Sequence, residues 1–545
     1  MEMTRRNFLS TAAASGAFVA AGTVGTPMSA LADEAGGFVG HTWDIKPEPI
    51  TDIATVEDYE VVVVGAGIAG VNAFEAACEA GAKTVLIEQA EKVTGHGAYN
   101  GCMNCTLQKE AGLSFNPDEA IKLMMRFGQQ IVNRELLEVW AYRSGEVMDH
   151  IIELVAPKGL EAAIAVGQTA KGDWDTNPEP WREFRTSLFF NATDALGDAD
   201  ENGNYPEYFL GCALVEIGQE FGGQVVFNTH AEQLVGDAKS GITGVVCRAE
   251  DGSFIQYNAS KGVILATGDI AGNPEMVDVW APIIKRAEYN FYFPKGGNHG
   301  DGILMGKWAG AALSMSPAAP MVHPYSLERW LTPLDMCWLA VNKYGKRYGC
   351  EVPYEPFITN GVMTQPQGRG YYIFDANYEK YVVQQHEDSY ELILADVQSK
   401  IDFAIESGQM FRGNTLEELA EALGIDAAEF AKTVERYNGY YDAGVDLEYD
   451  TPARFLSRID TPPFYAGQVP TNMLCCPFGL HVDRNSQVLT DQDEPIAGLF
   501  AIGNVQGDFY AFDYPVTTPG ISHGRCLTFG QLVGRAVAQG TTING

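Results

Sequence analysis

The sequence predicts an α/β fold in which one sheet covered by helices is interrupted by an inserted domain. An unbroken apolar run at 59–64 leads directly into a Gly-x-Gly-x-x-Gly turn, which is typical of a buried parallel strand followed by a helix. Strand-and-glycine character returns near the end of the chain, after an aromatic-rich stretch from roughly 320 to 475. Since 545 residues are too many for one core, a domain inserted between two parts of one sheet fits this order.

The turn after the apolar run carries Gly65, Gly67 and Gly70. In a Rossmann-like unit, glycines at these positions permit the tight turn, the close approach of the backbone to a pyrophosphate and the packing of helix on strand. The helix that we expect from about 68 to 80 would point its N-terminal amides at the phosphates. The next strand, TVLIEQ, contains Glu88, whose carboxylate can accept hydrogen bonds from ribose hydroxyls. This segment therefore predicts a dinucleotide site.

The N-terminal segment has the three parts of an export signal. It begins with the pair Arg5 and Arg6, continues with an apolar run rich in Ala and Gly, and ends with the small-residue motif ALA. We expect a twin-arginine signal peptide at 1–32 and a linker at 33–56; the alternative is a basic start on a disordered tail. The signal predicts export of the folded protein to the periplasm or the extracytoplasmic face of a bacterial cell envelope. No later segment has ~18 uninterrupted apolar residues, so we expect no integral membrane segment after signal removal.

The amino-acid composition argues against some classes of ligand. The formal net charge of −35 argues against nucleic acid, whose phosphates require a basic protein surface. The sequence holds 10 cysteines, with one CMNC pair at 102–105 but no second pair at metal-ligand spacing. This pattern argues against zinc or an iron–sulfur cluster, so we expect no metal and mostly buried thiols.

Several glycine-rich segments occur in the order of one known family. They are TGHGAYNGCMN, THAEQLV, ATGDIAGNPEM, NHGDGILMGKWAGA, PIAGLFAIGN and TPGISHGRCLTFGQLVGR. In this order they resemble the FAD-dependent fumarate reductase and 3-ketosteroid dehydrogenase group of flavoproteins. The resemblance implies FAD as the cofactor. It also implies a Rossmann-like FAD-binding domain at 57–318 and 477–545, interrupted by an α+β substrate-capping domain at 319–476.

The resemblance also implies which residues hold the FAD. They are Gly65, Gly67, Ala69, Gly70, Glu88, Gln89, Gly95, Asn100, Gly101, Ala231, Thr267, Gly268, Asp301, Gly503, Asn504, Gly520 and Ile521. Some relatives bind FAD covalently through a histidine in the loop that covers the flavin. His96 falls one residue away from that position. We therefore expect a non-covalent FAD.

Three residues are the catalytic candidates. His323, in MVHPYS, matches a substrate-contacting histidine of the fumarate reductases, and its alternative role is structural. The arginine expected after the turn YGKRYGCE is absent, and Tyr354 lies within one residue of a Pro-Tyr pair of the ketosteroid enzymes. FDYPVTTPG supplies Tyr514, where those enzymes polarise a carbonyl with a Tyr-Pro pair. The alternative for each tyrosine is an ordinary buried aromatic residue.

The absence of expected basic side chains limits the charge that the substrate can carry. A dicarboxylate needs bidentate cations to offset its desolvation, and the family's HTMGG histidine is also replaced, by CCPFG. A phenol can donate one hydrogen bond or one proton to an uncharged acceptor, and Arg525 could accommodate a monocarboxylate. We therefore predict an exported FAD-dependent reductase that passes a hydride to the C=C bond of an enone or enoate, with the proton from a tyrosine.

The predicted reaction requires a substrate and a source of electrons, and two alternative functions remain open. The substrate would be a small-molecule alkene. No Cys-x-x-Cys-His haem motif occurs, so electrons would come from an external donor: a cytochrome, an FMN protein or a quinol-linked protein. The first alternative is a 3-ketosteroid-type dehydrogenase, which introduces a C=C bond with the same groups. The second is a non-catalytic flavin electron carrier, against which the inserted domain and His323 argue.

Overall fold

The structure of this chain is a computed structural model that describes residues 41–165, 184–191, 204–291, 296–324, 336–352, 355–386 and 390–543. The chain divides into two units, 1–47 and 48–545. The described part of the first unit holds one short 3-10 helix, η1 (Thr42–Asp44). All other described helices and strands belong to the second unit. The predicted signal peptide and Tyr354 lie outside the described residues.

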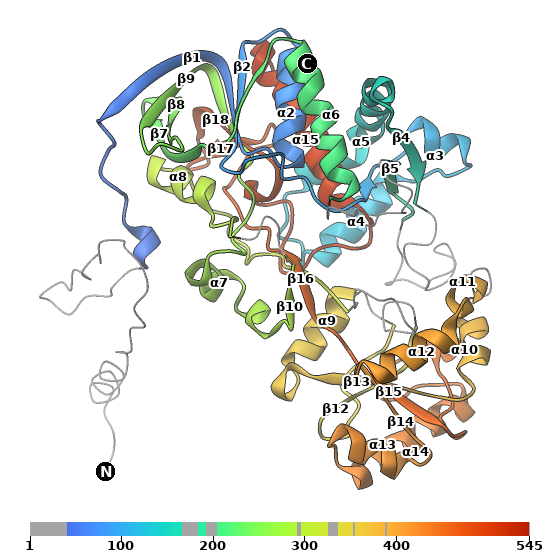
Figure 1. Cartoon of the computed structure of the whole chain (residues 1–545). Coiled ribbons are helices and arrows are strands. Elements are labelled where there is room, and N and C mark those ends of the chain that lie inside the picture. Colours follow the sequence, from blue (N-terminus) through green and yellow to red (C-terminus); the bar gives the residue numbers. More distant parts are fainter. Residues whose placement is uncertain are drawn as a thin grey trace, which may run out of the picture. The chain divides into compact units, whose positions relative to one another are not determined.

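The second unit contains an eight-stranded sheet with the order β17-β18-β9-β1-β2-β6, which β7 and β8 extend from β9 (Figure 1). Strand β1 pairs in parallel with β2 and β9, and β18 returns late in the chain to lie parallel to β9. The strands are β1 (Ile53–Val64), β2 (Thr84–Ile87), β6 (Gln224–Val226), β7 (His230–Asp237), β8 (Gly241–Arg248), β9 (Phe254–Leu265), β17 (Gln487–Leu489) and β18 (Pro495–Ala501).

Strand β1 is longer than the apolar run that predicts it. It begins at Ile53, and its first residues pair with β9 although most of their side chains are exposed. Val61 to Val64 are almost completely buried, as a central strand requires. The exposed half has no continuous apolar signal, so the sequence pattern predicts only the buried end.

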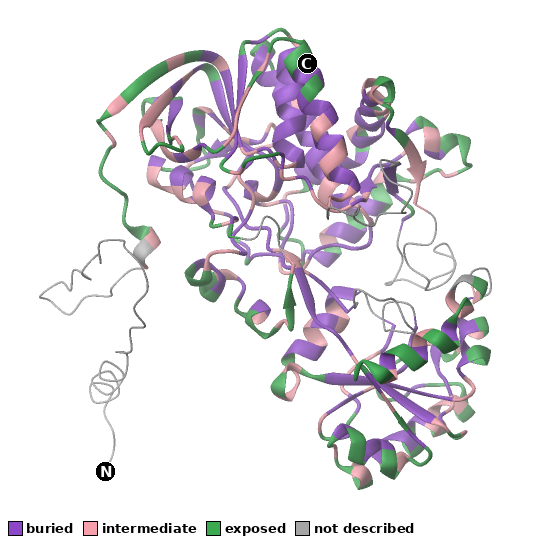
Figure 2. Ribbon diagram, in the orientation of Figure 1, coloured by how far each residue is buried: buried purple, intermediate pink, exposed green. Residues whose placement is uncertain are grey.

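Three helices lie side by side over this sheet: α2 (Ile68–Glu79), α6 (Pro206–Glu220) and α15 (Ile521–Gln539). Figure 2 shows α2 and α15 buried along most of their length. A Cβ atom at Gly534 of α15 would lie 2.4 Å from the carbonyl oxygen of Ala73 in α2. The two helices can therefore pack backbone against backbone only because residue 534 is a glycine.

Smaller elements surround this core. The helices are α3 (Thr106–Glu110), α4 (Pro117–Phe127), α5 (Arg134–Val155), α7 (Pro274–Trp280) and α8 (Asp301–Ala309). A three-stranded sheet has the order β3-β5-β4. Its strands are β3 (Asn100–Gly101), β4 (Glu161–Ile164) and β5 (Ser187–Asn191). The remaining 3-10 helices are η2 (Ala156–Lys158), η3 (Pro282–Arg286), η4 (Pro366–Gly368), η5 (Ala453–Phe455) and η6 (Gly503–Val505).

Between two parts of the large sheet, the chain forms a second, antiparallel sheet with the order β12-β13-β15-β14. Along its strand β13, Tyr371 and Ile373 pack on one helical layer, whereas Tyr372 and Phe374 pack on the other. This alternation places helices α13 and α14 on one face and α10 and α12 on the other. The elements are β12 (Leu339–Asn342), α9 (Glu355–Thr364), β13 (Gly370–Asp375), α10 (Tyr378–Gln385), α11 (Tyr390–Leu394), α12 (Val397–Glu406), β14 (Met410–Gly413), α13 (Leu416–Leu423), α14 (Ala427–Ala443) and β15 (Phe464–Gln468).

A small sheet joins the chain segments that enter and leave this region. Strand β11 (Met321–His323) leads in, β16 (Asn472–Cys475) leads out, and the two pair antiparallel. Strand β10 (Tyr289–Asn290) pairs with the other edge of β16. His323 thus lies opposite Asn472, at the point where the chain passes between the two larger sheets.

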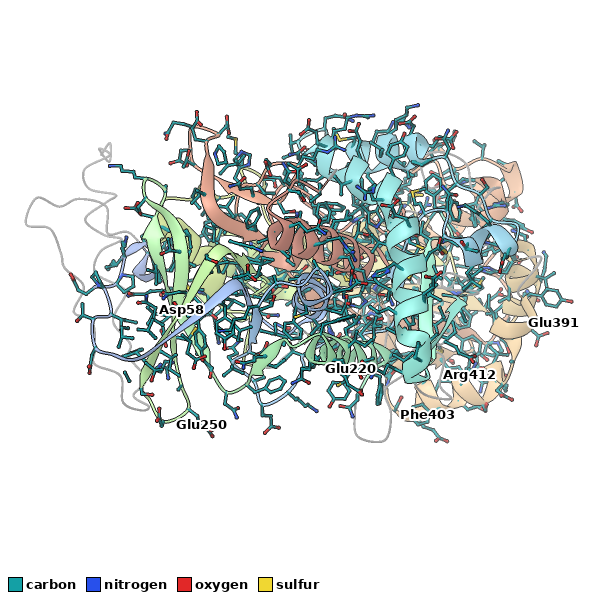
Figure 3. The ribbon with its side chains drawn as sticks, turned by 90° about the horizontal axis from the view of Figure 1, so that it is seen from above. Asp58, Glu220, Glu250, Glu391, Phe403 and Arg412 are labelled. Atoms are coloured by element: carbon teal, nitrogen blue, oxygen red, sulfur yellow. The ribbon has the colours of Figure 1, made fainter. Side chains whose placement is uncertain are left out.

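Within the described ranges, no helix is long and apolar enough to cross a membrane, and no group of side chains could hold a metal ion. All ten cysteines are described, and all are free. The acidic composition is visible on the surface: Glu220, Glu250 and Glu391, labelled in Figure 3, are exposed.

Candidate active site

The turn between β1 and α2 is closed on one side and open on the other. Gly65 has a φ of 104° and donates its N–H to the carbonyl oxygen of Ile87 over 2.7 Å. A Cβ at Gly70 would lie 1.8 Å from the carbonyl oxygen of Gly65, so only glycine fits there. A Cβ at Gly67 would meet nothing nearer than Thr94 Oγ1, at 3.9 Å. The open side is where a phosphate could approach the helix N-terminus.

Glu88, at the end of β2, is 5% exposed. Its two carboxylate oxygens accept the N–H groups of Ala66, over 2.6 Å, and of Ala90, over 2.8 Å. Burial raises the pKa of this carboxyl, and the backbone N–H groups oppose the rise. Glu88 therefore ties the end of β2 to the glycine turn, and its remaining lone pairs are what a ribose hydroxyl would use. Gln89 is exposed beside it.

Ala231 and Asp301 are brought near each other by His230. The imidazole of His230 lies 3.5 Å from Asp301 and 3.3 Å from Glu232. Hydrogen bonds to Asp301 and Glu232 raise the pKa of His230 to about 9. Ala231 is buried on β7, and Asp301 begins α8.

The strand end at Thr267 and Gly268 packs against the same helix. A Cβ at Gly302 of α8 would lie 2.1 Å from Thr267 Oγ1, which has no hydrogen-bond partner among the described residues. Gly268 has a φ of 81°, in the left-handed region that favours glycine. The backbone therefore turns sharply just after β9 ends at Leu265.

The loop around residues 95 to 101 lies against the N-terminus of α15. Gly101 donates its N–H to the carbonyl oxygen of Gly520 over 2.7 Å, and Ile521 begins the helix. A Cβ at Gly95 would lie 2.5 Å from the carbonyl oxygen of Glu207. The predicted cofactor positions of this loop and of the last helix are therefore in direct contact.

A buried carboxyl lies behind this loop. Asn100 donates a hydrogen bond of 2.6 Å to Glu207 Oε1, and both residues are 0% exposed. Burial raises the pKa of Glu207 to about 8. Asn100 Oδ1 and Glu207 Oε2 have no partner among the described residues. The sequence prediction missed Glu207, because an acid within a helical pattern normally indicates a solvated face.

A second buried network connects three chain segments. Asp269 accepts a hydrogen bond of 3.1 Å from Asn504 Nδ2, and Asn504 Oδ1 accepts one of 2.8 Å from Arg525 Nη2. Arg525 is 0% exposed, and its Nε and Nη1 have no partner in the part of the chain that the structure describes. A buried guanidinium with two unpaired nitrogen atoms is costly unless a ligand pairs with them.

These unpaired atoms test whether the residues fit FAD. Buried polar groups without partners are rare in folded proteins, and here several lie at or beside predicted cofactor positions. Asn100, Thr267 and Arg525 supply such atoms, and a Cβ at Gly520 would lie 2.8 Å from the unpaired Ser187 Oγ. Together with the open glycine turn, they describe a site that a large polar cofactor would complete. The residues fit FAD.

His323 is buried at the end of β11. Its Nδ1 lies 2.5 Å from Oε2 of Glu355, and Glu355 is the first residue of α9. Both side chains are at most 10% exposed. The neighbouring Tyr354 lies outside the described residues. Glu355 was not predicted as a site residue, although it follows the predicted Tyr354 directly in the sequence.

Tyr514 lies in a buried aromatic cluster. Its hydroxyl oxygen accepts the N–H of Ser522 over 2.7 Å, and burial raises its pKa well above the ordinary value. Its ring centroid is 5.3 Å from that of Tyr510, and the Tyr510 ring centroid is 4.5 Å from the Arg525 guanidinium carbon. A phenol and a guanidinium are therefore both present at the N-terminal end of α15.

Helix α9 contacts one catalytic candidate and the residue that precedes the other. Its first residue, Glu355, pairs with His323, and Asn360 on the same helix donates a hydrogen bond to Asp513, which precedes Tyr514. Five residues of α-helix span roughly 7.5 Å. Burial raises the pKa of Asp513 to about 6.

Arg347, in the turn YGKRYGCE, is not available to a substrate. Its guanidinium is completely buried and forms paired hydrogen bonds with Glu351, at 2.8 and 2.6 Å, and with Asp446, at 2.9 and 2.7 Å. Although burial opposes ionisation, hydrogen bonds from Arg347 hold the pKa of Asp446 well below its ordinary value. These hydrogen bonds from Arg347 hold the turn that precedes α9 in place.

Residues 60–514 match the protein family described as FAD binding domain. The chain belongs to this FAD-binding family. It is 27% identical over 496 residues to urocanate reductase of Eggerthella lenta, covering 88% of this chain and 76% of that protein. It is also 27% identical over 583 residues to 3-oxosteroid 1-dehydrogenase of Mycolicibacterium smegmatis, covering 89% and 98%. Vinyl phenol reductase of Lactiplantibacillus plantarum is 24% identical over 515 residues, covering 90% and 98%.

Two solved structures have the same fold as this chain. The open conformation of a flavocytochrome c3 fumarate reductase has a TM-score of 0.60 at 24% identity and covers 89% of this chain and 79% of its own. A 3-ketosteroid-Δ4-(5α)-dehydrogenase of Rhodococcus jostii has a TM-score of 0.68 at 23% identity, covering 90% and 98%. These similarities confirm the predicted α/β fold class and the FAD cofactor. They also confirm the prediction that the protein is an FAD-dependent oxidoreductase. The roles of the individual site residues stay predictions.

Proposed function

We propose that this chain is an exported FAD-dependent reductase of activated C=C bonds. The acceptor would be an enone or a monocarboxylic enoate, and the electrons would come from a separate cytochrome, FMN protein or quinol-linked protein. FAD, when bound, supplies the hydride that is added to one carbon of the alkene. The relatives named as urocanate reductase and vinyl phenol reductase support reduction of a C=C bond.

One arrangement carries this proposal. Helix α9 holds Glu355 against His323 and Asn360 against Asp513, next to Tyr514. Helix α9 therefore contacts one catalytic candidate, His323, and the residue that precedes the other. An enzyme needs such preorganised groups, whereas an electron carrier has no use for them.

Tyr514 has the properties of a hydrogen-bond donor. The N–H of Ser522 occupies one lone pair of its hydroxyl, and the described residues supply no acceptor for its hydrogen. Because burial raises its pKa, the phenol keeps this proton at neutral pH. It can therefore donate to an activating carbonyl or protonate the carbon next to the one that receives the hydride. His323, oriented by Glu355, would hold the substrate.

The charges favour an acceptor with at most one carboxylate. Arg347 is paired with Glu351 and Asp446, so it cannot offset the desolvation of a second carboxylate. Arg525 is completely buried, and its Nε and Nη1 have no partner among the described residues, so it could pair with a single carboxylate. The proposal is tested by mixing the reduced holoenzyme with a panel of enones and enoates in a stopped-flow instrument. Failure of every acceptor to oxidise the flavin would reject it.

The reverse reaction is the second candidate. A 3-oxosteroid 1-dehydrogenase matches 89% of this chain, and a phenol that polarises a carbonyl serves both directions. Adding a 3-oxosteroid to the oxidised holoenzyme without any reductant distinguishes the two. Bleaching of the flavin would support a dehydrogenase, and an unchanged spectrum would support a reductase.

The proposal that the protein is exported rests on the N-terminal sequence alone. We expect that replacing Arg5 and Arg6 together by lysine leaves the FAD-loaded protein inside the cell, because the twin-arginine route requires the arginine pair. Fractionation of cells that produce the two forms measures this. Equal amounts of both forms outside the cytoplasm would contradict it.

A further inference from the structure

A tight turn centred on Phe512 lies between Tyr510 and Tyr514. Phe512 has a φ of 65°, in the left-handed region, and the N–H of Asp513 donates to the carbonyl oxygen of Ala511 over 2.8 Å. In the described ranges, the other non-glycine residues with a positive φ are Asn, Asp, Gln or Ser. Asn and Asp adopt the left-handed region most readily, whereas a bulky aromatic residue is strained there. The backbone at Phe512 is therefore strained.

This turn brings two phenol rings together. Tyr510 precedes it and Tyr514 follows it, and their ring centroids lie 5.3 Å apart. The hydroxyl oxygen of Tyr514 accepts the N–H of Ser522 over 2.7 Å. Ser522 lies in the first turn of α15, where an N–H group has no partner within the helix. Since Tyr514 is two residues from Phe512, a change of φ at Phe512 would move the phenol away from this N–H group.

A strained turn persists only where surrounding contacts hold it. On one side, Asn360 of α9 donates a hydrogen bond to the carboxylate of Asp513, which receives no other side-chain or backbone hydrogen bond from the described residues. On the other side, the carbonyl oxygen of Tyr510 accepts the Ser316 hydroxyl over 3.3 Å. The Arg525 guanidinium carbon lies 4.5 Å from the centroid of the Tyr510 ring. Of these contacts, only that of Asn360 comes from the inserted region.

We propose that Asn360 and Phe512 are positioning residues for Tyr514. Asn360 holds Asp513, the turn at Phe512 is thereby kept in its left-handed form, and the turn places the Tyr514 hydroxyl on the N–H of Ser522. The chemical consequence rests on the proposed function, in which Tyr514 donates its hydrogen to the acceptor. The placement of the phenol does not, because it can be measured without any substrate. Loss of the Asn360 hydrogen bond should let Phe512 relax to a negative φ and release the phenol.

The strain at Phe512 allows a test by suppression. Asn360→Ala removes the hydrogen bond to Asp513. Phe512→Gly and Phe512→Ala both remove the aromatic ring, but only glycine adopts a positive φ without strain. Thr364→Ala, which changes an exposed residue of the same helix, is the control for Asn360→Ala. The single variants, and the double variants of Asn360→Ala with each change at Phe512, are prepared as FAD-loaded proteins.

The first measurement is hydrogen exchange at the Ser522 amide, resolved by mass spectrometry with fragmentation. Asn360→Ala should raise the exchange rate at least about 10-fold in the wild-type and Phe512→Ala backgrounds, and less than about 3-fold in the Phe512→Gly background. Thr364→Ala should leave the rate unchanged. Equal increases in all three backgrounds would overturn the proposal, as would no increase in the wild-type background.

A second measurement does not depend on whether Asn360→Ala folds. Glycine ordinarily makes a protein less stable than alanine at the same position, because it loses more conformational freedom on folding. At a strained left-handed position the order reverses, so Phe512→Gly should melt at a higher temperature than Phe512→Ala. A lower melting temperature for Phe512→Gly would show that the turn is not strained and would overturn the proposal.

Turnover separates this inference from the proposed function. In the reductase assay, Asn360→Ala should lower kcat at least about 10-fold with little change in KM, and the loss should be less than about 3-fold in the Phe512→Gly background. If no alkene is reduced but exchange at Ser522 follows the expected pattern, the proposed function fails and the positioning of Tyr514 stands. If alkenes are reduced and Asn360→Ala leaves kcat unchanged, the positioning role fails alone.

Discussion

The backbone N–H of Ser522, in the first turn of α15, donates a hydrogen bond of 2.7 Å to the hydroxyl oxygen of Tyr514. This contact fixes the direction of the phenol and leaves its hydrogen for another acceptor. It also connects a predicted catalytic group to the helix whose N-terminus carries the predicted cofactor residues Gly520 and Ile521. Because a helix N-terminus carries partial positive charge, the same end can favour negative charge that develops on an acceptor held by Tyr514.

The first prediction concerns this phenol. Tyr514→Phe should lower kcat for alkene reduction about 10²- to 10⁴-fold, the range for loss of one general acid, and leave the FAD content unchanged. The control is Tyr344→Phe, which removes the hydroxyl of an exposed tyrosine. Steady-state turnover and the absorbance of bound flavin measure both. Full activity in Tyr514→Phe would reject a proton-donating or polarising role.

The second prediction concerns the pair His323 and Glu355. Glu355→Gln keeps an oxygen near His323 Nδ1 but loses the negative charge, and we expect kcat/KM to fall about 10-fold. If Glu355 acts by orienting the imidazole, His323→Ala and the double variant should have similar activities. A double-mutant cycle of kcat/KM measures the coupling. Strictly additive losses would mean that the two residues act independently.

The third prediction concerns the glycine turn. Gly70→Ala places a Cβ 1.8 Å from the carbonyl oxygen of Gly65, so the turn must open and FAD retention should be lost. Gly439→Ala is the matched helical control, because its Cβ has open space, and it should stabilise the protein by up to about 1 kcal/mol. The flavin-to-protein absorbance ratio after gel filtration measures how much FAD each variant retains. A Gly70→Ala protein with full FAD would show that the turn tolerates a side chain.

The sequence could predict the parts of this protein that depend on local patterns. The strand at 59–64, the glycine turn and the strand that ends in Glu88 are adjacent in sequence, and their spacing alone determines the geometry. The order of the glycine-rich segments predicted the FAD cofactor in another way, through its resemblance to a known family of flavoproteins.

The buried polar pairs could not be predicted in this way. Asn100 meets Glu207 from more than 100 positions away, and Asn504 meets Asp269 from more than 200. Such pairs depend on tertiary packing, which brings together residues whose local patterns are unrelated. Arg347 shows the same limit: the sequence placed it in a family turn, but only the structure shows that Glu351 and Asp446 occupy its guanidinium.

The fourth prediction concerns Arg525. Arg525→Met keeps the length and apolar stem of the side chain but removes the unpaired Nε and Nη1 groups, so FAD affinity should fall about 10- to 100-fold. The control on the same helix is Arg535→Met, which breaks a partly exposed bridge to Glu79 worth at most about 1 kcal/mol. Titration of FAD into the flavin-free proteins measures the affinities. If Arg525→Met keeps its FAD affinity but loses enoates and not enones, Arg525 instead binds the substrate carboxylate.

The last prediction concerns the pH dependence of stability through Glu207. Burial raises the pKa of this carboxyl in the folded protein to about 8, from an ordinary value of 4.5. Between these values the folded state holds a proton that the unfolded chain has released. The contribution of Glu207 to stability is therefore fully present below pH 4.5 and is lost as the pH rises through about 8.

Glu207→Gln keeps an oxygen to accept the hydrogen bond from Asn100 but cannot ionise. We expect the free energy of unfolding of the wild type to fall relative to this variant as the pH rises from 5 to 8, by up to about 1.4 kcal/mol per pH unit. Denaturant unfolding at several pH values measures the difference. Glu216→Gln, which changes an exposed acid on the same helix, should follow the wild type. A constant difference between wild type and Glu207→Gln across this range would mean that Glu207 ionises normally, with an ion or water reaching its carboxyl in the folded protein.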